Sequence, residues 1–335
     1  MKTARLLGKE QVEIIEVDDP VPGEGQVLVK IEASLLCGSE MHGYRGEQAQ
    51  KTNGGHEPAG VIVDASRSRR WHDGQRVGIH AVWGCGQCDW CLRGIYTWCD
   101  HRGGCPGAHS EYLAVPDHVL VPLPDEVSFE VGALLAGDGI GVPYHTAQRL
   151  SARGGDRVVV IGCGPIGLGN IMLQSFRGAE VIALDIVPER LAMAADAGAA
   201  VTINSQEREP LAAINDLTGG RLAEVVIEAT GRPEGFGLAL KLVGKGGTVA
   251  CCGENREVTL NVGNDLIRRD IAVFGSWFFH FREYPDMLEL YRRGLPLEKL
   301  VTHRFRLADI GQAFAAFAAG KVGKPAILPQ ANGHR

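Results

Sequence analysis

The feature that most constrains the fold of this chain is the alternation of apolar strands and helices that begins at residue 157. One of the helices has Pro188 in its first turn and Gly198 at its end, which are ordinary start and stop signals. The predicted strands cover residues 157–162, 180–185, 223–229 and 247–251, and the predicted helices cover residues 166–177, 188–198 and 234–243. Continuously apolar strands joined by helices form a parallel sheet covered on both faces, which predicts the α/β class.

The first 135 or so residues follow a different pattern. Short β-branched runs such as Val27–Ile31 and Gly60–Asp64, interrupted by glycine and proline, predict an irregular β domain. Helices predicted at Pro285–Arg293 and Leu307–Ala319, with a strand near Ala326–Leu328, should return to complete it. A chain of 335 residues is long enough for two domains. We predict a β-rich domain over residues 1–139, completed by residues 276–335, and a parallel-sheet domain over residues 140–275.

Composition limits the classes of function. Apolar residues make up 45% of the chain and charged residues 22%, and the net charge of −6 gives no general attraction to nucleic acid or acidic membranes. The N-terminal residues lack the apolar stretch of a signal peptide, and no run of about 20 apolar residues could span a bilayer. We expect a cytoplasmic protein without a nucleic-acid or membrane partner, whose nine cysteines serve as metal ligands, catalytic groups or packed thiols rather than disulfides.

Four of these cysteines lie close together in the sequence. Cys85, Cys88, Cys91 and Cys99 are separated by two, two and seven residues, a spacing at which four thiolates can converge on one tetrahedral ion. Four sulfur ligands leave no open position, so the pattern predicts a structural zinc site. Packed or disulfide-paired cysteines, or an iron–sulfur cluster, are the alternatives.

A glycine-rich turn follows the first predicted strand of the α/β region. The segment Gly162–Gly167 opens a helix, and Asp185 closes the next strand 23 residues after the first glycine, a context that makes this pattern informative. We expect Gly162 to permit the tight turn, Gly164 to let the backbone approach a pyrophosphate, and Gly167 to allow close helix–strand packing. The segment predicts a dinucleotide site; a glycine turn without a dinucleotide is the alternative.

Asp185 also bears on the choice between NAD and NADP. Its carboxylate would accept hydrogen bonds from the adenosine ribose and repel a 2′-phosphate, and Ile186 and Val187 supply no cation, so the sequence favours NAD. Arg190 leaves an alternative open, since it could reach a ribose hydroxyl or, if Asp185 turned away, a phosphate. The candidate cofactor contacts are Gly162, Gly164, Pro165, Ile166, Gly167, Asp185, Arg190 and Thr230.

Three further segments carry groups that could bind a metal or move a proton. They are Cys37–His42, Gly55–Glu57 and Gly137–Gly139. Each has an ordinary explanation by itself, because a single cysteine is usually a core thiol, a His-Glu pair can lie on the surface, and an aspartate between glycines is common in turns.

Taken together, these motifs resemble the zinc-dependent medium-chain alcohol dehydrogenase family across nearly the whole chain. The Cys-Gly-Ser-x-x-His segment, the Gly-His-Glu segment, the four-cysteine lobe and the dinucleotide turn occur in the family's order. The resemblance implies a GroES-like β-rich catalytic domain, a Rossmann NAD-binding domain of doubly wound parallel-sheet type, two zinc ions per chain, and a homodimer or homotetramer.

The resemblance also implies roles for individual residues. Cys37, His56 and Asp138 would bind the catalytic zinc, with Glu57 close enough to enter its coordination shell. Ser39 would take the proton of the alcohol and pass it through the nicotinamide ribose to His42. Lys324 would reach the cofactor phosphates.

The sequence departs from the family pattern in three places. Glu40 stands where aspartate is commoner, which leaves its role in orienting His56 open. Asp138 stands where other branches have cysteine or glutamate. The segment after the cysteine lobe is short, and His101 or His109 could substitute for one of the lobe cysteines.

The expected reaction is hydride transfer between NAD(H) and a secondary alcohol or ketone. A pocket lined by Ser39, His42, Tyr44, Trp83, Ile140 and Trp277, together with Arg45 and Glu57, offers more hydrogen-bonding groups than a simple aliphatic alcohol needs. That favours a polyol, sugar or cyclitol as the substrate, with an anionic or phosphorylated substrate left open by Arg45. The alternatives are a zinc-independent quinone or enone reductase of the same superfamily, and a non-catalytic zinc-stabilised nucleotide-binding protein.

Overall fold

The computed structural model describes residues 1–105 and 107–330. The chain divides into two compact units, each with its own main sheet. The first unit contains Met1–Gly141, Phe279–Tyr291 and the chain from Val301 onward, and the second contains Val142–Phe278 and Arg292–Leu300. Within the described residues, no helix is both long and apolar enough to cross a bilayer.

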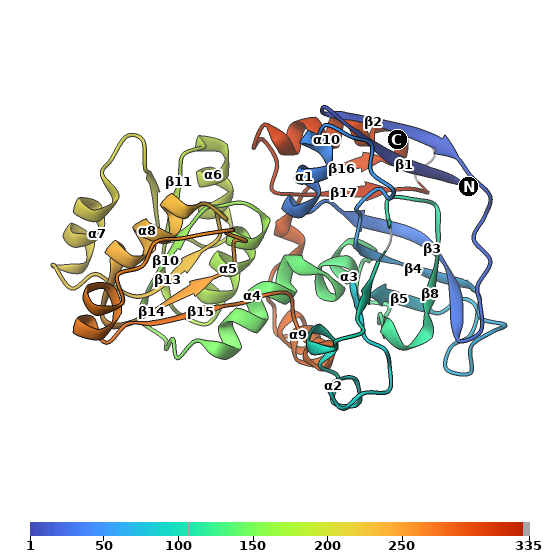
Figure 1. The fold of residues 1–335 in the computed structure, drawn as a ribbon, viewed down its shortest axis with the longest axis horizontal. Coiled ribbons are helices and arrows are strands. Elements are labelled where there is room, and N and C mark those ends of the chain that lie inside the picture. Colours follow the sequence, from blue (N-terminus) through green and yellow to red (C-terminus); the bar gives the residue numbers. More distant parts are fainter. Residues whose placement is uncertain (106, 331–335) are drawn as a thin grey trace. The chain divides into compact units, whose positions relative to one another are not determined.

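The second unit is built on a six-stranded parallel sheet in the order β12-β11-β10-β13-β14-β15 (Figure 1). Its strands are β10 (Arg157–Ile161), β11 (Glu180–Asp185), β12 (Val201–Asn204), β13 (Ala223–Glu228), β14 (Val243–Cys251) and β15 (Ala272–Gly275). The chain runs outward from β10 to β12 and then returns to the other side of β10, so the strand order reverses between β10 and β13. Open α/β sheets bind ligands outside the carboxyl ends of the strands at such a reversal.

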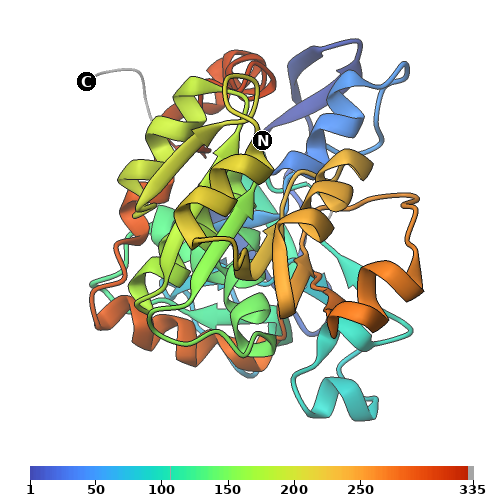
Figure 2. The ribbon, with the colours of Figure 1, turned by 90° about the vertical axis from the view of Figure 1, so that its left-hand side faces the viewer.

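Four helices alternate with these strands, and the sequence prediction of the α/β class is confirmed. They are α5 (Pro165–Phe176), α6 (Pro188–Asp196), α7 (Pro210–Thr218) and α8 (Pro233–Leu242), coloured green to orange in Figure 2. Each has a proline in its first turn, where the missing N–H costs no hydrogen bond. The predicted strand at 247–251 is longer in the structure, because β14 begins directly after α8, and β12 and α7 were absent from the prediction.

The first unit contains a seven-stranded mixed sheet. Its strands follow the order β16-β17-β3-β4-β5-β9, with β8 also paired to β3; only β16 and β17 pair in parallel. The strands are β3 (Gln26–Leu35), β4 (Glu57–Asp64), β5 (Arg76–Ile79), β8 (Tyr112–Pro116), β9 (Leu120–Pro122), β16 (Val301–Arg306) and β17 (Lys324–Leu328). A separate hairpin is formed by β1 (Lys2–Gly8) and β2 (Gln11–Glu16).

The helices of the first unit are short. They are η1 (Gly38–Glu40), α1 (Met41–Arg45), α2 (Asp89–Leu92), η2 (Tyr96–Trp98), η3 (Asp117–Val119), α3 (Phe129–Ala136), η6 (Phe281–Glu283), α9 (Tyr284–Arg292), η8 (Leu307–Asp309) and α10 (Ile310–Ala318). The small strands β6 (Val82–Trp83) and β7 (Gly103–Gly104) pair beside the cysteine segment. Helix α4 (Asp138–Arg149) begins in the first unit and continues into the second, and η4 (Val262–Leu266), η5 (Ile267–Arg269) and η7 (Leu297–Leu300) belong to the second.

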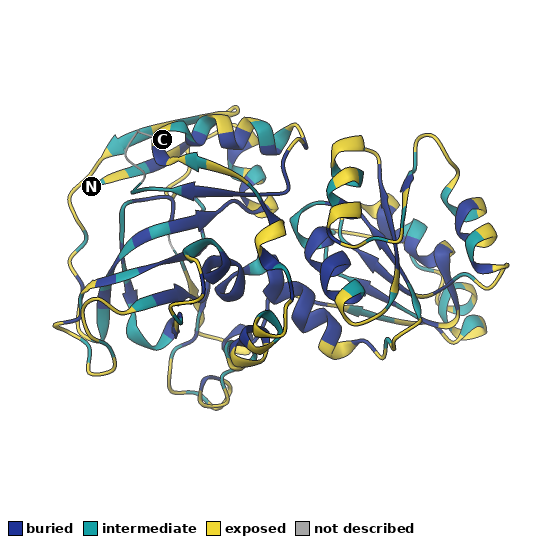
Figure 3. Cartoon of the chain, turned by 180° about the vertical axis from the view of Figure 1, so that it is seen from behind, coloured by how far each residue is buried: buried dark blue, intermediate teal, exposed yellow. Residues whose placement is uncertain are grey.

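The sheet of the first unit brings distant segments to one end. Leu35 at the end of β3 pairs with Glu57 at the start of β4 and with Ala326 of β17. The residues just after β3, just before β4 and at the start of β17 therefore lie near one another. Helix α3 packs on β3, β4 and β5, and its continuation into α4 delivers Asp138 to the same region. Figure 3 shows the central strands of this sheet as largely buried.

Candidate functional site

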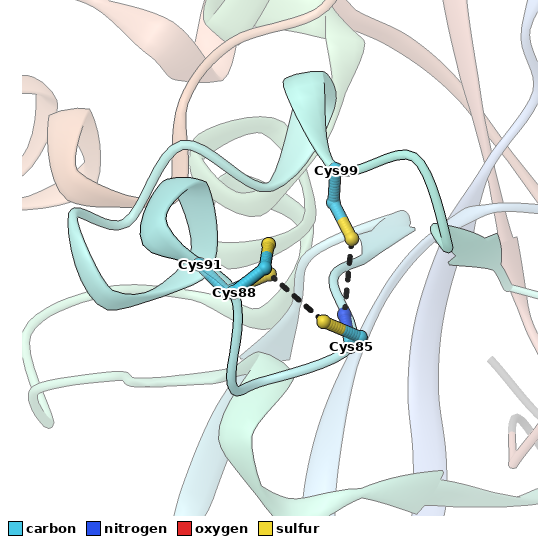
Figure 4. Close-up of side chains that lie close together, drawn as sticks. All are labelled: Cys85, Cys88, Cys91 and Cys99. Carbon is cyan, nitrogen blue, oxygen red and sulfur yellow. Dashed lines mark hydrogen bonds between the residues drawn. The ribbon is translucent and has the colours of Figure 1, made fainter.

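The four cysteines of the segment 85–99 converge. Figure 4 shows their thiols pointing toward one another, and the four sulfur atoms all lie within 4.8 Å of one another. The Cys85 and Cys91 sulfurs are 3.9 Å apart, and the backbone N–H of Cys85 donates to the Cys99 sulfur at 3.4 Å. All nine cysteines are within the described residues, and all are free. The structure therefore contradicts the alternative of disulfide pairing.

Local backbone geometry and electrostatics account for this cluster. Gly86 has a φ of +78°, which favours glycine and turns the chain between Cys85 and Cys88. The N–H groups of Gln87 and Cys88 lower the pKa of Cys85 to about 6, whereas burial raises the pKa of Cys91 to about 12. The set of four sulfurs fits a closed tetrahedral zinc site, because a divalent cation would neutralise thiolates that otherwise repel one another.

A second cluster contains Cys37, His56, Glu57 and Asp138, whose potential ligand atoms all lie within 4.8 Å of one another. The Cys37 thiol donates to Asp138 Oδ2 at 3.3 Å, and His56 Nε2 lies 3.1 Å from the same oxygen. Cys37 and Glu57 are buried, and the side chains of His56 and Asp138 are 17% and 14% exposed. A thiol, an imidazole and a carboxylate are the donors that zinc takes in proteins.

The surroundings of this second cluster favour positive charge. Burial acts against a charged imidazole, but the contacts with Asp138 and Cys37 outweigh it and raise the pKa of His56 well above its usual value. Burial likewise acts against ionisation of Asp138, yet the neighbouring His56 holds the pKa of Asp138 below its usual value. A site that stabilises a charged imidazole between a thiol and a carboxylate is suited to a cation.

Glu57 is held by two donors inside the same region. Its Oε2 accepts a hydrogen bond from the backbone N–H of Gly139 at 3.1 Å, and its Oε1 accepts one from Lys324 Nζ. Burial raises the pKa of Glu57 in spite of the opposing effect of Lys324. Burial disfavours the charge of Lys324, but Glu57, Cys37 and Asp138 together raise the pKa of Lys324 above its usual value.

Ser39 and His42 lie on the helical segment that follows Cys37. Ser39 belongs to η1 and His42 to α1, and both residues are exposed. Among the residues that the structure describes, neither side chain makes a hydrogen bond, so both hydroxyl and imidazole are available to another molecule.

The glycine-rich turn has the geometry that each glycine requires. Gly162 has a φ of +92°. A Cβ at Gly167 would overlap the carbonyl oxygen of Gly162, which is why the helix can lie close to the strand only with glycine there. A Cβ at Gly164, by contrast, would meet nothing within 4 Å, so the space beside this residue is open. Pro165 and Ile166 form the first turn of α5.

Asp185 is fixed beside this turn. Its Oδ2 accepts a hydrogen bond from the backbone N–H of Cys163 at 2.7 Å, and its Oδ1 accepts from Ile186 and Val187 at 2.7 and 3.0 Å. The carboxylate therefore points into the turn and does not swing away from it. Arg190 lies in the first turn of α6, and its Nε is buried without a hydrogen-bond partner among the described residues.

Thr230 follows β13, and its hydroxyl donates to Glu228. The methyl group of Thr230 is also the nearest atom to a Cβ built on Gly162, at 2.8 Å. The structure thus brings Thr230 against the glycine-rich turn, although the two segments are far apart in the sequence.

Comparison with known proteins decides the family. Residues 23–125 match the alcohol dehydrogenase GroES-like domain, and residues 165–293 match the zinc-binding dehydrogenase domain. The chain is 35% identical to the uncharacterized zinc-type alcohol dehydrogenase-like protein YphC of Escherichia coli K12, over 98% of each protein. It belongs to the zinc-dependent medium-chain dehydrogenase family. The GroES-like and Rossmann-type domains expected from the resemblance are confirmed.

Two further members of the family show the range of named activities. L-Threonine 3-dehydrogenase of Bacillus velezensis is 30% identical, over 94% of each chain. The crystal structure of galactitol-1-phosphate dehydrogenase from Escherichia coli superposes with a TM-score of 0.86 at 27% identity, covering 98% of this chain and 100% of the other.

Within this family fold, the expected role of Lys324 is wrong, and the alternative of a histidine ligand in the cysteine lobe does not hold. Lys324 was expected at the cofactor phosphates, but its side chain is 2% exposed and its Nζ is paired with Glu57. His109 was considered as a substitute ligand for the cysteine lobe, but its ring is hydrogen-bonded to Ser34 and Glu40, and among the residues that the structure describes the lobe cluster contains the four cysteines alone. His101 is exposed and is not part of that cluster either.

The expected substrate pocket also needs correction. The Tyr44 ring is buried against Phe314, with the ring centroids 5.1 Å apart, and Ile140 is fully buried. The Arg45 guanidinium donates to the carbonyl oxygen of Ala318 at 3.0 Å. Tyr44 and Arg45 therefore stabilise the packing of α1 against α10. They do not supply the hydrogen-bonding groups that were predicted to line a substrate pocket.

The contacts of Glu40 and His109 behind the second cluster were not predictable from the sequence. Glu40, whose role in orienting His56 the sequence left open, has its Oε1 3.9 Å from His56 Nδ1, and that nitrogen also lies 2.9 Å from the carbonyl oxygen of Gly54. Glu40 bonds to His109 and to the backbone of Cys37. The departure from aspartate at this position was the one signal in the sequence that pointed to a different arrangement.

Proposed function

We propose that the protein is an NAD-dependent zinc dehydrogenase that interconverts a secondary alcohol and a ketone, with two zinc ions per chain, and acts as a cytoplasmic homodimer or homotetramer. The observation that carries the proposal is the convergence of Cys37, His56 and Asp138, whose contacts through Asp138 Oδ2 are 3.3 and 3.1 Å long. Three protein ligands leave the fourth position of a tetrahedral ion open, as a catalytic zinc site requires.

The proposed site assigns a task to each residue. Cys37, His56 and Asp138 hold the catalytic zinc, and Cys85, Cys88, Cys91 and Cys99 hold the structural one. When bound, zinc would supply a Lewis acid for the alcohol oxygen, and the nicotinamide would supply the hydride acceptor. Ser39 would take the proton of the alcohol, and His42 would deliver it to solvent. Both side chains are exposed and lack a protein partner among the described residues, which supports this path.

Glu57 has a supporting task in the proposed mechanism. Its carboxylate is tied to Lys324 and to the N–H of Gly139, the residue that follows Asp138. It is therefore placed to steady the start of α4 while remaining within 4.8 Å of the other potential ligands.

Three observations support NAD as the cofactor. Gly164 leaves open space at the start of α5, where backbone N–H groups and the helix dipole favour a pyrophosphate. Asp185 is fixed at the end of β11, where a carboxylate accepts ribose hydroxyls and repels a 2′-phosphate. Arg190 and Thr230 lie beside the same turn, and each is assigned here a contact with the cofactor.

A polyol, sugar or cyclitol hydroxyl is the substrate class we propose. The support comes from the family members named above, one of which acts on galactitol 1-phosphate and another on L-threonine, both of which carry a secondary alcohol beside further polar groups. Tyr44 and Arg45 are engaged with the α10 region and are not assigned to the substrate.

A substrate panel tests the proposal directly. The zinc-loaded protein should reduce NAD in the presence of at least one secondary alcohol from a panel of polyols, sugars, cyclitols, their phosphates and L-threonine, and mass spectrometry should identify the corresponding ketone. NADP in place of NAD should give a much lower kcat/KM. Turnover of quinones or enones by zinc-free protein would point to the reductase, and cofactor binding without turnover on the whole panel would point to a non-catalytic nucleotide-binding protein.

A further inference from the structure

The His109 ring is fully buried, and both of its nitrogens have a partner. Nε2 lies 2.8 Å from Glu40 Oε2, and Nδ1 lies 2.9 Å from the Ser34 hydroxyl. The side chains of His109 and Glu40 are 0% and 1% exposed. A buried imidazole and a buried carboxylate in contact need well-defined partners, because either group would be costly to bury alone.

Glu40 connects this ring to the Cys37 segment. While Oε2 contacts His109, Oε1 accepts a hydrogen bond from the backbone N–H of Cys37 at 2.9 Å. Ser34, the other partner of the ring, belongs to β3, the strand that leads into Cys37. The His109 ring therefore contacts this chain segment at two points. One is the Ser34 hydroxyl before Cys37, and the other is Glu40, which holds the backbone N–H of Cys37.

The same ring lies against the segment that carries His56. A Cβ built on Gly55 would be 2.8 Å from the backbone nitrogen of His109 and 2.9 Å from two of its ring carbons. The N–H of Ala108 donates to the carbonyl oxygen of Gly55 at 2.8 Å. Only glycine at position 55 lets the two segments come this close, so the segment that carries His56 packs directly against His109.

Asn53 ties the two segments together further. Its Oδ1 accepts hydrogen bonds from the N–H groups of Gly55 and His109 at 3.1 and 3.3 Å, and its Nδ2 donates to the carbonyl oxygen of His109 at 3.1 Å. The carbonyl oxygen of Gly54, in the same short segment, lies 2.9 Å from His56 Nδ1. The orientation of the His56 ring thus depends on a segment that is fixed against His109.

We propose that His109 is a positioning residue of the catalytic zinc site. It aligns the Cys37 segment through Glu40 and the His56 segment through the backbone of Gly55, so that two ligands from distant parts of the chain meet at one point. The inference rests on the proposed function, because it assumes that Cys37 and His56 bind a metal ion. Without the ring, the Oε2 of Glu40 would be buried and unpaired, and Glu40 would lose the geometry that holds the Cys37 backbone.

The test compares His109→Phe with His109→Gln in the zinc-loaded protein. Phenylalanine preserves an aromatic ring but removes both hydrogen-bonding nitrogens, whereas glutamine preserves a donor toward Glu40. The measurements are the rate at which each zinc ion passes to a chelator and the visible absorption spectrum after cobalt(II) replaces the catalytic zinc. Cys37→Ser identifies the catalytic phase of release, because that variant should lack it.

His109→Phe should release the catalytic zinc at least about tenfold faster than wild type, as expected when a partner of a ligand segment is lost, and should shift the cobalt spectrum. His109→Gln should stay close to the wild-type rate and spectrum. The zinc of the four-cysteine lobe should leave at the wild-type rate in both variants, which separates positioning from a general loss of stability.

Wild-type release rates and an unchanged cobalt spectrum in His109→Phe would overturn the inference, and so would equal acceleration in the phenylalanine and glutamine variants. If His109→Phe does not fold, Ser34→Ala decides, because it removes one partner of the ring with little change in volume: faster catalytic-zinc release supports the inference and a wild-type rate overturns it. Failure of the proposed function has a different signature, namely a wild-type protein with a single release phase that Cys37→Ser leaves intact.

Discussion

Lys324 and Glu57 form an ion pair that is almost fully excluded from solvent, with side-chain exposures of 2% and 0%. The two residues begin β17 and β4, and both strands flank β3 in the sheet of the first unit. The pair therefore joins the returning C-terminal segment to the segment that carries the proposed zinc ligand His56.

Lys324→Met should lower the free energy of unfolding by about 3–5 kcal/mol, because it leaves the Glu57 carboxylate buried without its cation. Denaturant unfolding of the zinc-loaded protein measures the change. The double variant Lys324→Met/Glu57→Leu should recover much of the loss, since no buried charge remains. Arg306→Ala is a matched control that breaks the exposed pair with Asp309 and should change stability little. Equal losses in Lys324→Met and Arg306→Ala would contradict this account of the pair.

Two glycines of the dinucleotide turn should respond differently to alanine. Gly167→Ala places a Cβ on the carbonyl oxygen of Gly162, so it should lower both stability, by roughly 1–3 kcal/mol, and NAD affinity. Gly164→Ala meets no protein atom within 4 Å, so it should leave the unfolding midpoint unchanged while raising the NAD dissociation constant about tenfold or more. Thermal unfolding and cofactor titration of both variants give the comparison. An unaltered NAD affinity in Gly164→Ala would show that the backbone there does not approach the cofactor.

The thiols of Cys251 and Cys252 should react slowly with iodoacetamide. Burial raises the pKa of Cys251 to about 11 and that of Cys252 to about 12. Because the thiolate is the reactive form and these pKa values lie above the working pH, only about 10⁻⁴ of a thiol with a pKa near 12 is ionised at pH 8. The rate should rise with pH toward the pKa. Mass spectrometry of the folded protein measures the modification, and protein unfolded in guanidinium is the control. Modification of Cys252 at the rate of a free thiol would refute the prediction.

Local patterns in the sequence predicted the parts of the fold that depend on local physics. The parallel sheet follows from strands such as 157–162 that are apolar on both faces, and the cysteine lobe follows from thiols spaced closely enough to share one ion. The turn at Gly162–Gly167 was also predictable, because glycine is needed there for a positive φ and for close packing.

The contacts behind the proposed zinc ligands depend on long-range packing and were not predictable. Lys324 is 267 residues from Glu57, and His109 is 69 residues from Glu40, so no periodic pattern connects either pair. The prediction that the side chains of Tyr44 and Arg45 line a substrate pocket was wrong for a related reason. Both lie on the short helix α1, and the packing of α10 against it decides which way their side chains point.

Counting zinc in wild-type protein and in Cys37→Ser tests the central claim most directly. The account predicts two zinc ions per chain in the wild type and one in Cys37→Ser. Alcohol-dependent NAD reduction should be lost in the variant, because the catalytic site has lost one of its three protein ligands. Cys252→Ser is the matched control, since it also replaces a free thiol, here a partly buried one, but should retain both zinc ions and turnover. A wild-type protein with one zinc ion, or a Cys37→Ser variant that keeps both ions and full turnover, would contradict the account.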